Sequence, residues 1–244
     1  MKTWKVLAGL TLLLKLPASG ADFLINSRLQ SQYIAGNGAV FHDKPVIQSD
    51  LLVSFQNGAY ADIWHSSSLK FDNPNLGPDD EIDLMLGWTK SFRLVTLDVG
   101  ALYMNFADLK TSRGDGILPY LEISKTPQGK KSISPYVRFQ PAFPVSGEYP
   151  QKGYYAAAGL YVSQQTKKSG PEMKHKLSVI YDSGTFGYEK NTIGEYRFEL
   201  AYQIGKLMKL ILPSVSAYIP LSHPSEYDGR KTSVSVGTGL NVSF

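Results

Sequence analysis

The fold is decided by the stretch SVSVGTGLNVSF, residues 233–244. Its even-numbered positions hold Val, Val, Thr, Leu, Val and Phe, whereas its odd-numbered positions hold only Ser, Gly and Asn. A period of two puts the first set on one face of a β-strand and the second set on the other. The stretch is also longer than the roughly five or six residues of an ordinary globular strand. It therefore predicts a long strand with one apolar and one polar face.

The same alternation recurs along the chain. Residues 81–88 place Ile82, Leu84, Leu86 and Trp88 on the face opposite Glu81 and Asp83, and residues 195–204 alternate in the same way. No stretch shows a sustained helical period with caps. The pattern predicts an all-β fold of about twelve antiparallel strands, at residues 23–34, 45–57, 59–67, 81–90, 92–106, 116–125, 134–143, 153–164, 173–182, 194–204, 207–219 and 231–244.

Strand length and loop rhythm separate a soluble sandwich from a membrane barrel. Most of the predicted strands have nine or more residues, which is about what a tilted strand needs to cross a bilayer. Tight joins at Asn57-Gly58, Ser91 and Gly205-Lys206 alternate with long polar links such as 68–80 and 220–230. Short periplasmic turns and longer extracellular loops are typical of outer-membrane barrels. We therefore expect one transmembrane antiparallel β-barrel over residues 22–244.

Two features interrupt this pattern. The links 126–133 and 165–172 are long where short turns are expected. Pro119 and Pro213 fall inside predicted strands, and a proline removes a donor from the hydrogen-bond ladder. Each should mark a bulge or a shifted strand boundary.

The N-terminal residues have the composition of a secretory signal peptide. Lys2 and Lys5 precede the apolar stretch 6–14, and Pro17 and the small residues 19–21 follow it. The apolar stretch is shorter than the roughly 20 residues of a spanning helix. We expect a signal peptide over residues 1–21 and a mature chain that starts near Asp22.

Composition limits the other function classes. The chain has no cysteine, so no disulfide stabilises it. Its net charge is +4, but the basic residues occur at most in adjacent pairs such as Lys130-Lys131 and Arg230-Lys231. Such pairs in turns favour solvated ends near lipid headgroups over a nucleic-acid partner.

Four segments carry a resemblance to a known family: DKPVIQ at 43–48, NGAYADIW at 57–64, EIDLMLGW at 81–88 and LDVGALY at 97–103. In order and spacing they resemble the TorF-type porins of proteobacterial outer membranes. The resemblance implies a multi-pass position in the outer membrane of a Gram-negative bacterium, and implies the architecture more than a particular solute. Phe244, at the end of an alternating strand, is similar to the signal that the outer-membrane assembly machinery reads.

In a membrane barrel the polar face points inward. The alternation therefore predicts seven carboxylates and four basic groups in the interior. These residues are Arg28, Asp50, Asp62, Glu81, Asp83, Asp98, Glu122, Arg138, Lys176, Arg197 and Glu199. Aromatic rings favour the headgroup level of a membrane. We expect Trp88 and Tyr202 at the periplasmic interface, and Tyr103, Tyr181 and Tyr196 at the outer one, with Phe244 also at an interface. Outer-membrane lipid and lipopolysaccharide would surround them.

Candidate chemistry is weak. His65-Ser66 suggests a hydrolase, but no serine motif like that of the outer-membrane phospholipase is present. Asp79, Asp80, Glu81 and Asp83 are acidic neighbours without the spacing of an EF-hand. We expect no metal, cofactor or catalytic residue. The function favoured is a passive channel for small polar solutes or ions. The alternatives are a non-conducting barrel with binding loops and, less favoured, a lipid hydrolase.

Overall fold

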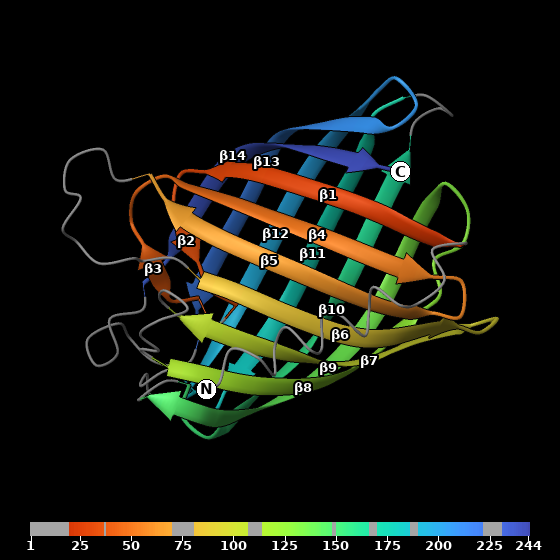
Figure 1. Ribbon diagram of the computed structural model, residues 1–244. Helices are drawn as coiled ribbons and strands as arrows, with labels where there is room; N and C mark the ends of the chain where they lie inside the picture. Colours follow the sequence, from red (N-terminus) through yellow and green to blue (C-terminus); the bar gives the residue numbers. More distant parts are fainter. Residues whose placement is uncertain are drawn as a thin grey trace, which may run out of the picture.

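The computed structural model describes residues 20–36, 38–69, 81–106, 114–147, 150–165, 170–185, 190–221 and 231–244. Within them, twelve strands form one closed antiparallel barrel (Figure 1), as the sequence predicts. In order along the chain these strands are β1 (Ala21–Gln30), β4 (Val46–Phe55), β5 (Ala59–Ser68), β6 (Glu81–Ser91), β7 (Val95–Phe106), β8 (Gly114–Lys125), β9 (Lys131–Gly147), β10 (Gly153–Gln165), β11 (Glu172–Asp182), β12 (Asn191–Ile204), β13 (Met208–Pro220) and β14 (Ser233–Ser243).

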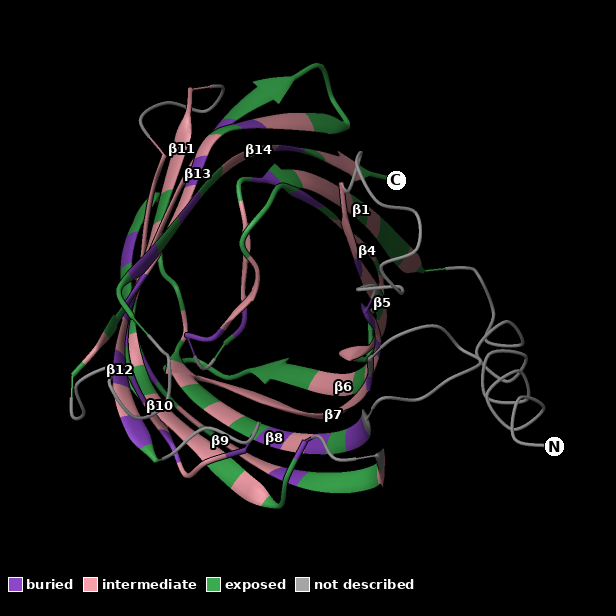
Figure 2. Ribbon diagram, turned by 90° about the vertical axis from the view of Figure 1, so that its left-hand side faces the viewer, coloured by how far each residue is buried: buried purple, intermediate pink, exposed green. Residues whose placement is uncertain are grey.

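Each strand pairs with its neighbour in the sequence, and β1 closes the ring by pairing with both β4 and β14. At this seam the backbones of Phe23 and Phe244 exchange hydrogen bonds of 3.3 and 2.9 Å. A closed ring leaves no unpaired strand edge, and a hydrocarbon environment requires this of any structure that crosses it. Figure 2, turned by 90° from Figure 1, shows the ring of strands.

Side chains alternate between the outside and the interior. On β6, Leu86 is exposed on the outside, whereas Asp83 and Met85 line the interior. On β14, the outward residues Val234, Val236 and Leu240 are exposed. An apolar exterior over a polar interior is the arrangement expected of a barrel in lipid.

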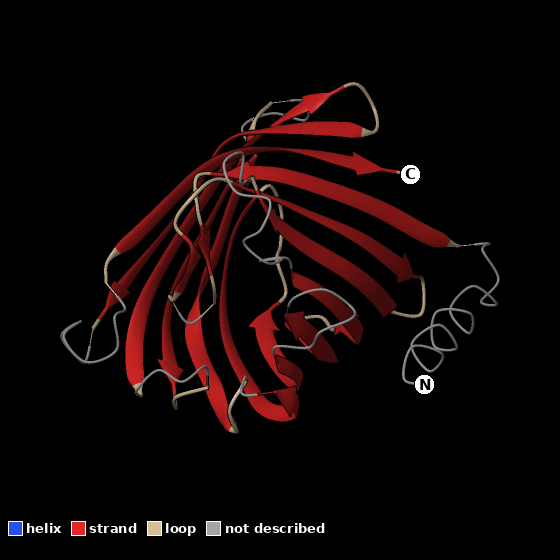
Figure 3. Ribbon diagram, turned by 60° about the vertical axis from the view of Figure 1, so that its left-hand side comes forward, coloured by secondary structure: helices blue, strands red, loops and turns tan. Residues whose placement is uncertain are grey.

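The connections follow the predicted asymmetry. Short turns join the strands at one end, including 56–58, 92–94 and 205–207. The 126–130 turn, which was expected to be long, has five residues between β8 and β9. The described residues contain no helix long and apolar enough to cross a membrane, and among them Figure 3 shows only strands and loops.

The two proline predictions have opposite outcomes. The register between β13 and β14 shifts between Ile211 and Ser214, on either side of Pro213, as predicted. Pro119 produces no such shift, because the β8–β9 pairs on either side of it share one register. The bulge in β8 lies instead between Asp115 and Gly116.

A small hairpin is the one element beyond the barrel among the described residues. It consists of β2 (Tyr33–Ile34) and β3 (Val40–His42), within the connection from β1 to β4. Figure 1 shows it at the end of the barrel that carries the long loops. The sequence pattern predicts a first strand that continues to residue 34, and it does not predict this hairpin.

Candidate functional site in the barrel interior

The barrel encloses a cavity of about 590 Å³ that is lined from strands on all sides. Eight of the eleven charged residues expected to point inward line it: Arg28, Asp50, Asp62, Asp83, Glu122, Arg138, Lys176 and Arg197. The other three make polar contacts beside it. Glu81 accepts a hydrogen bond from Tyr33, Asp98 accepts one from Tyr60, and Glu199 pairs with Arg28.

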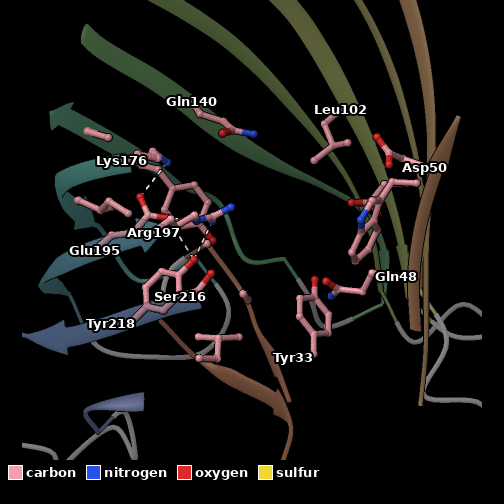
Figure 4. Close-up of a pocket in the computed structure, with 18 of the residues that line it drawn as sticks. Tyr33, Gln48, Asp50, Leu102, Gln140, Lys176, Glu195, Arg197, Ser216 and Tyr218 are labelled. Carbon is pink, nitrogen blue, oxygen red and sulfur yellow. Dashed lines mark hydrogen bonds and ion pairs between the residues drawn. The ribbon is translucent and has the colours of Figure 1, made fainter. Parts of the chain in front are cut away.

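One wall of the cavity carries a cluster centred on Glu195. The fully buried carboxylate of Glu195 pairs with Lys176 at 2.7 Å and with Arg197 at 2.6 Å. Tyr218 donates to Glu195 and accepts from Arg197, while Ser178 also donates to Glu195. Figure 4 shows Lys176, Glu195, Arg197 and Tyr218 together on this wall. Charged hydrogen bonds from several donors offset the cost of burying the carboxylate.

The remaining basic residues of the cavity are also paired. Arg138 lies 3.5 Å from Glu122 and stacks over the ring of Tyr120 at 4.2 Å. Arg28 forms an ion pair of 2.5 Å with Glu199. Every basic residue that lines the cavity therefore has a carboxylate partner.

The opposite wall, formed by β4, β5 and β6, is acidic. Asp50 and Asp83 lie directly across from Trp64 on its two neighbouring strands, and Asp62 lies two residues from Trp64 on β5. Asp50 accepts a 2.8 Å hydrogen bond from Asn26. None of these three carboxylates forms an ion pair with a described basic residue.

The β2–β3 hairpin reaches into the cavity, where Tyr33, Ala35 and Phe41 contribute to its lining. Tyr33 donates a 2.7 Å hydrogen bond to Glu81, and its ring centroid lies 5.6 Å from that of Trp64. Burial, together with the charge of Glu81, raises the pKa of Tyr33 well above its usual value. Its hydroxyl therefore remains a hydrogen-bond donor. Figure 4 shows Tyr33 beside Gln48, across the cavity from the Glu195 cluster.

Sequence reasoning missed Glu195 and the inward tyrosines. Tyr120, Tyr136 and Tyr218 are buried on the interior face, although tyrosines were assigned only to the membrane interface. The alternation could have assigned these residues to the interior. Tyr136 shares a strand face with Arg138, and Glu195 shares one with Arg197.

The predicted interface aromatics occupy varied positions. Trp88 donates to the backbone of Asn57 at a short turn, and Tyr202 is exposed near the turn 205–207. Tyr103 donates to Asp115, and the ring centroid of Tyr181 lies 5.8 Å from that of Tyr154. Phe244, at the seam, is 63% exposed.

Tyr196 lies deeper than expected. β12 begins at Asn191, three residues before the predicted start at 194, so Tyr196 is five residues inside the strand. Its hydroxyl lies 3.1 Å from Nδ1 of His175. Its position at the outer membrane interface stays a prediction.

The candidate catalytic pair is not assembled. His65 and Ser66 are consecutive residues of β5, so their side chains point to opposite faces of the barrel wall. Ser66 is fully buried, and its hydroxyl has no hydrogen-bond partner. Of the acidic group proposed for calcium, Asp79 and Asp80 lie outside the described residues.

A closed antiparallel barrel with an apolar exterior and a charged interior has the fold of outer-membrane β-barrel proteins. The chain belongs to the Gcw_chp family, described as bacterial proteins of unknown function, whose profile matches residues 15–139. No curated protein matches the chain at a significant level.

Solved outer-membrane barrels share the fold. The KdgM porin is 15% identical, with a TM-score of 0.59 over 91% of this chain and 99% of that one. The NanC porin is 13% identical, with a TM-score of 0.61 over 89% and 98%. LpxR from Salmonella typhimurium, a hydrolase, is 8% identical, with a TM-score of 0.53 over 91% and 99%. Identities this low show the fold alone, so function must be argued from the interior.

Proposed function

We propose that this chain is an outer-membrane channel for the passive passage of small polar solutes or ions in a Gram-negative bacterium. The observation that carries the proposal is the cavity of about 590 Å³ inside a closed barrel, lined by charged residues on facing walls. A twelve-stranded barrel is wider than the eight-stranded barrels that side chains nearly fill. The resemblance of residues 43–103 to TorF-type porins supports the same function.

The proposal includes the route to the membrane. Residues 1–21 would direct export, and the strand that ends at Phe244 would be recognised by the assembly machinery. The outward aromatic residues would lie at the two lipid interfaces, among phospholipid and lipopolysaccharide.

Conductance of the refolded protein in a planar bilayer tests the proposal directly. We expect discrete, steady current steps, because charged and polar walls leave water and ions a favourable path. A heat-unfolded sample of the same preparation is the control. Membranes that stay silent with folded protein would contradict the channel.

The main rival is a non-conducting barrel whose loops bind a partner. The inward hairpin favours it, because Tyr33 and Phe41 occupy part of the interior. A lipid hydrolase is the weaker alternative, since His65 and Ser66 lie on opposite faces of β5. Silence in the bilayer would support the non-conducting barrel, and lipid turnover in the same preparation would support the enzyme.

The charge balance of the interior predicts a mild preference for cations. The four described basic residues of the cavity are paired, whereas Asp83 and Asp98 form no ion pair with a described basic residue. Unpaired acidic groups in a narrow polar passage attract cations, and salt screens them. The reversal potential under a salt gradient should indicate cation preference, most clearly at low ionic strength.

The preference should shrink when Asp83 and Asp98 are both changed to Asn. Glu172→Gln is a matched control, because Glu172 pairs with Lys174 and Lys209. An anion preference in the native protein would show that the paired basic groups, and not the acidic wall, dominate the passage.

A further inference from the structure

The acidic wall surrounds an indole ring. Trp64 has Asp50 directly opposite on β4, Asp83 directly opposite on β6, and Asp62 two residues away on its own strand. Side chains directly opposite in an antiparallel pair have Cβ atoms about 4.5–5.5 Å apart. Tyr33 of the hairpin covers a further side, with its ring tilted by 56° to the indole. All five residues line the cavity.

Charge is distributed unevenly around this cavity. Its described basic residues are held in ion pairs with other carboxylates, whereas Asp50, Asp62 and Asp83 form no ion pair with a described basic residue. Carboxylates that share one wall repel one another when they are ionised, and a bound cation stabilises their ionised forms. A cation is the solute that this wall attracts.

A buried acceptor at the same wall also lacks a partner. The side chain of Asp83 is almost completely buried, with a relative exposure of 7%, and its Oδ1 atom has no hydrogen-bond partner. Oδ1 of Asp62 is also buried without a partner. Buried polar atoms in native proteins are nearly always satisfied, so such orphans call for a ligand or an ordered water.

The geometry favours an organic cation over a metal ion. Among the described residues, no three His, Asp or Glu side chains converge closely enough to hold a metal. The carboxylates instead surround two aromatic rings, Trp64 and Tyr33. Rings of this kind bind ammonium and guanidinium groups through their electron-rich faces, and tryptophan does so most strongly.

We propose that Asp50, Asp62 and Asp83, together with Trp64 and Tyr33, form a binding site for small organic cations. The carboxylates supply the charge, and the two rings supply a surface for the ammonium or guanidinium group. The inference names a substrate class for the channel, and in that respect it rests on the proposed function. As a binding site, it can be measured without any current.

Choline is a suitable probe, and fluorescence of Trp64 reports its binding. The chain has three tryptophans. Trp4 lies in the expected signal peptide, so Trp88→Phe in the mature protein leaves Trp64 alone. Titration of this refolded protein with choline, at constant ionic strength, should give a saturable change in emission. Galacturonate, an anion related to the oligogalacturonate in a solved KdgM porin complex, should give none.

The carboxylates are tested one at a time. Asp83→Asn and Asp62→Asn should each raise the apparent Kd for choline by about tenfold, as expected for losing one partner of a partly desolvated charge pair. Two variants are used because the burial of Asp83 could make its replacement fold poorly; a heat-dependent gel shift checks folding. Glu172→Gln removes an equal charge outside the cavity and should leave the Kd unchanged.

Each outcome separates the site from the channel. Choline affinity that is the same in both Asn variants and in Glu172→Gln would overturn the site, as would equal binding of galacturonate. Choline binding without conductance would keep the site and overturn the channel. Conductance without choline binding would keep the channel and overturn the site.

Discussion

Replacing Gly159 with alanine should destabilise the folded barrel by about 3 kcal/mol, near the upper end for overpacking a well-packed interior. Gly159 lies in β10 between Tyr136 of β9 and Ser178 of β11. An added Cβ would overlap the carbonyl oxygen of Leu177 and lie 2.8 Å from Cε1 of Tyr136. Backbone atoms held in a ladder cannot move away, so the strands must separate.

Gly194→Ala is the matched control for this variant. Gly194 is also a strand glycine, in β12, but the nearest atoms to its added Cβ lie at 3.6 and 3.7 Å, an ordinary contact distance. Its replacement should cost little, because alanine also restricts the unfolded chain. Urea unfolding of both variants in lipid vesicles, followed by tryptophan emission, makes the comparison. Equal midpoints would mean that the interior packs loosely around Tyr136.

Removing the β2–β3 hairpin should raise the conductance at least about twofold, because the hairpin occupies part of the cross-section that ions would use. Gln30 and Val46 face each other at the ends of β1 and β4. A turn of two to four residues can therefore replace residues 31–45. Single-channel recording of this variant beside the native protein gives the measurement.

Tyr33→Phe is the companion to the deletion. It keeps the ring beside Trp64 but removes the hydrogen bond to Glu81. We expect only a small change in its conductance, because the hairpin also holds to the wall through Ser235, which donates to the backbone of Gln32. Unchanged conductance after the deletion would place the narrowest part of the passage elsewhere.

The strands were largely predictable because one physical rule governs them all. A strand between lipid and a polar interior must alternate, and β6, β11 and β14 therefore begin and end within two residues of their predicted limits. β9 was too short in the prediction, 134–143 against Lys131–Gly147. The observed strand contains Pro135, Pro141 and also Pro144, which lies beyond the predicted end.

For the interior, the sequence predicts which residues point inward but not which of them contact one another. Alternation assigns Arg197 to the inward face, but it does not show that Glu195 pairs with both Arg197 and Lys176. That arrangement depends on the register between β11 and β12, which a sequence pattern does not define. The hairpin was missed for a related reason. Its two strands are too short to show a period. Their contacts with Glu81 and Trp64 join residues that are far apart in the sequence, so a local pattern does not reveal them.

The seam between β1 and β14 makes barrel closure an event of a different kind from the eleven other strand pairings. Those pairings join strands that follow one another in the chain, so they can form in sequence. The seam joins Arg28 to Gly239 and Leu24 to Ser243, so it carries a far larger entropy of loop closure. Until it forms, β1 and β14 each present a bare edge to the bilayer, where unpaired backbone groups are costly. A chain whose β14 is missing or mispaired therefore cannot close the barrel. It stays an open sheet that proteases can reach.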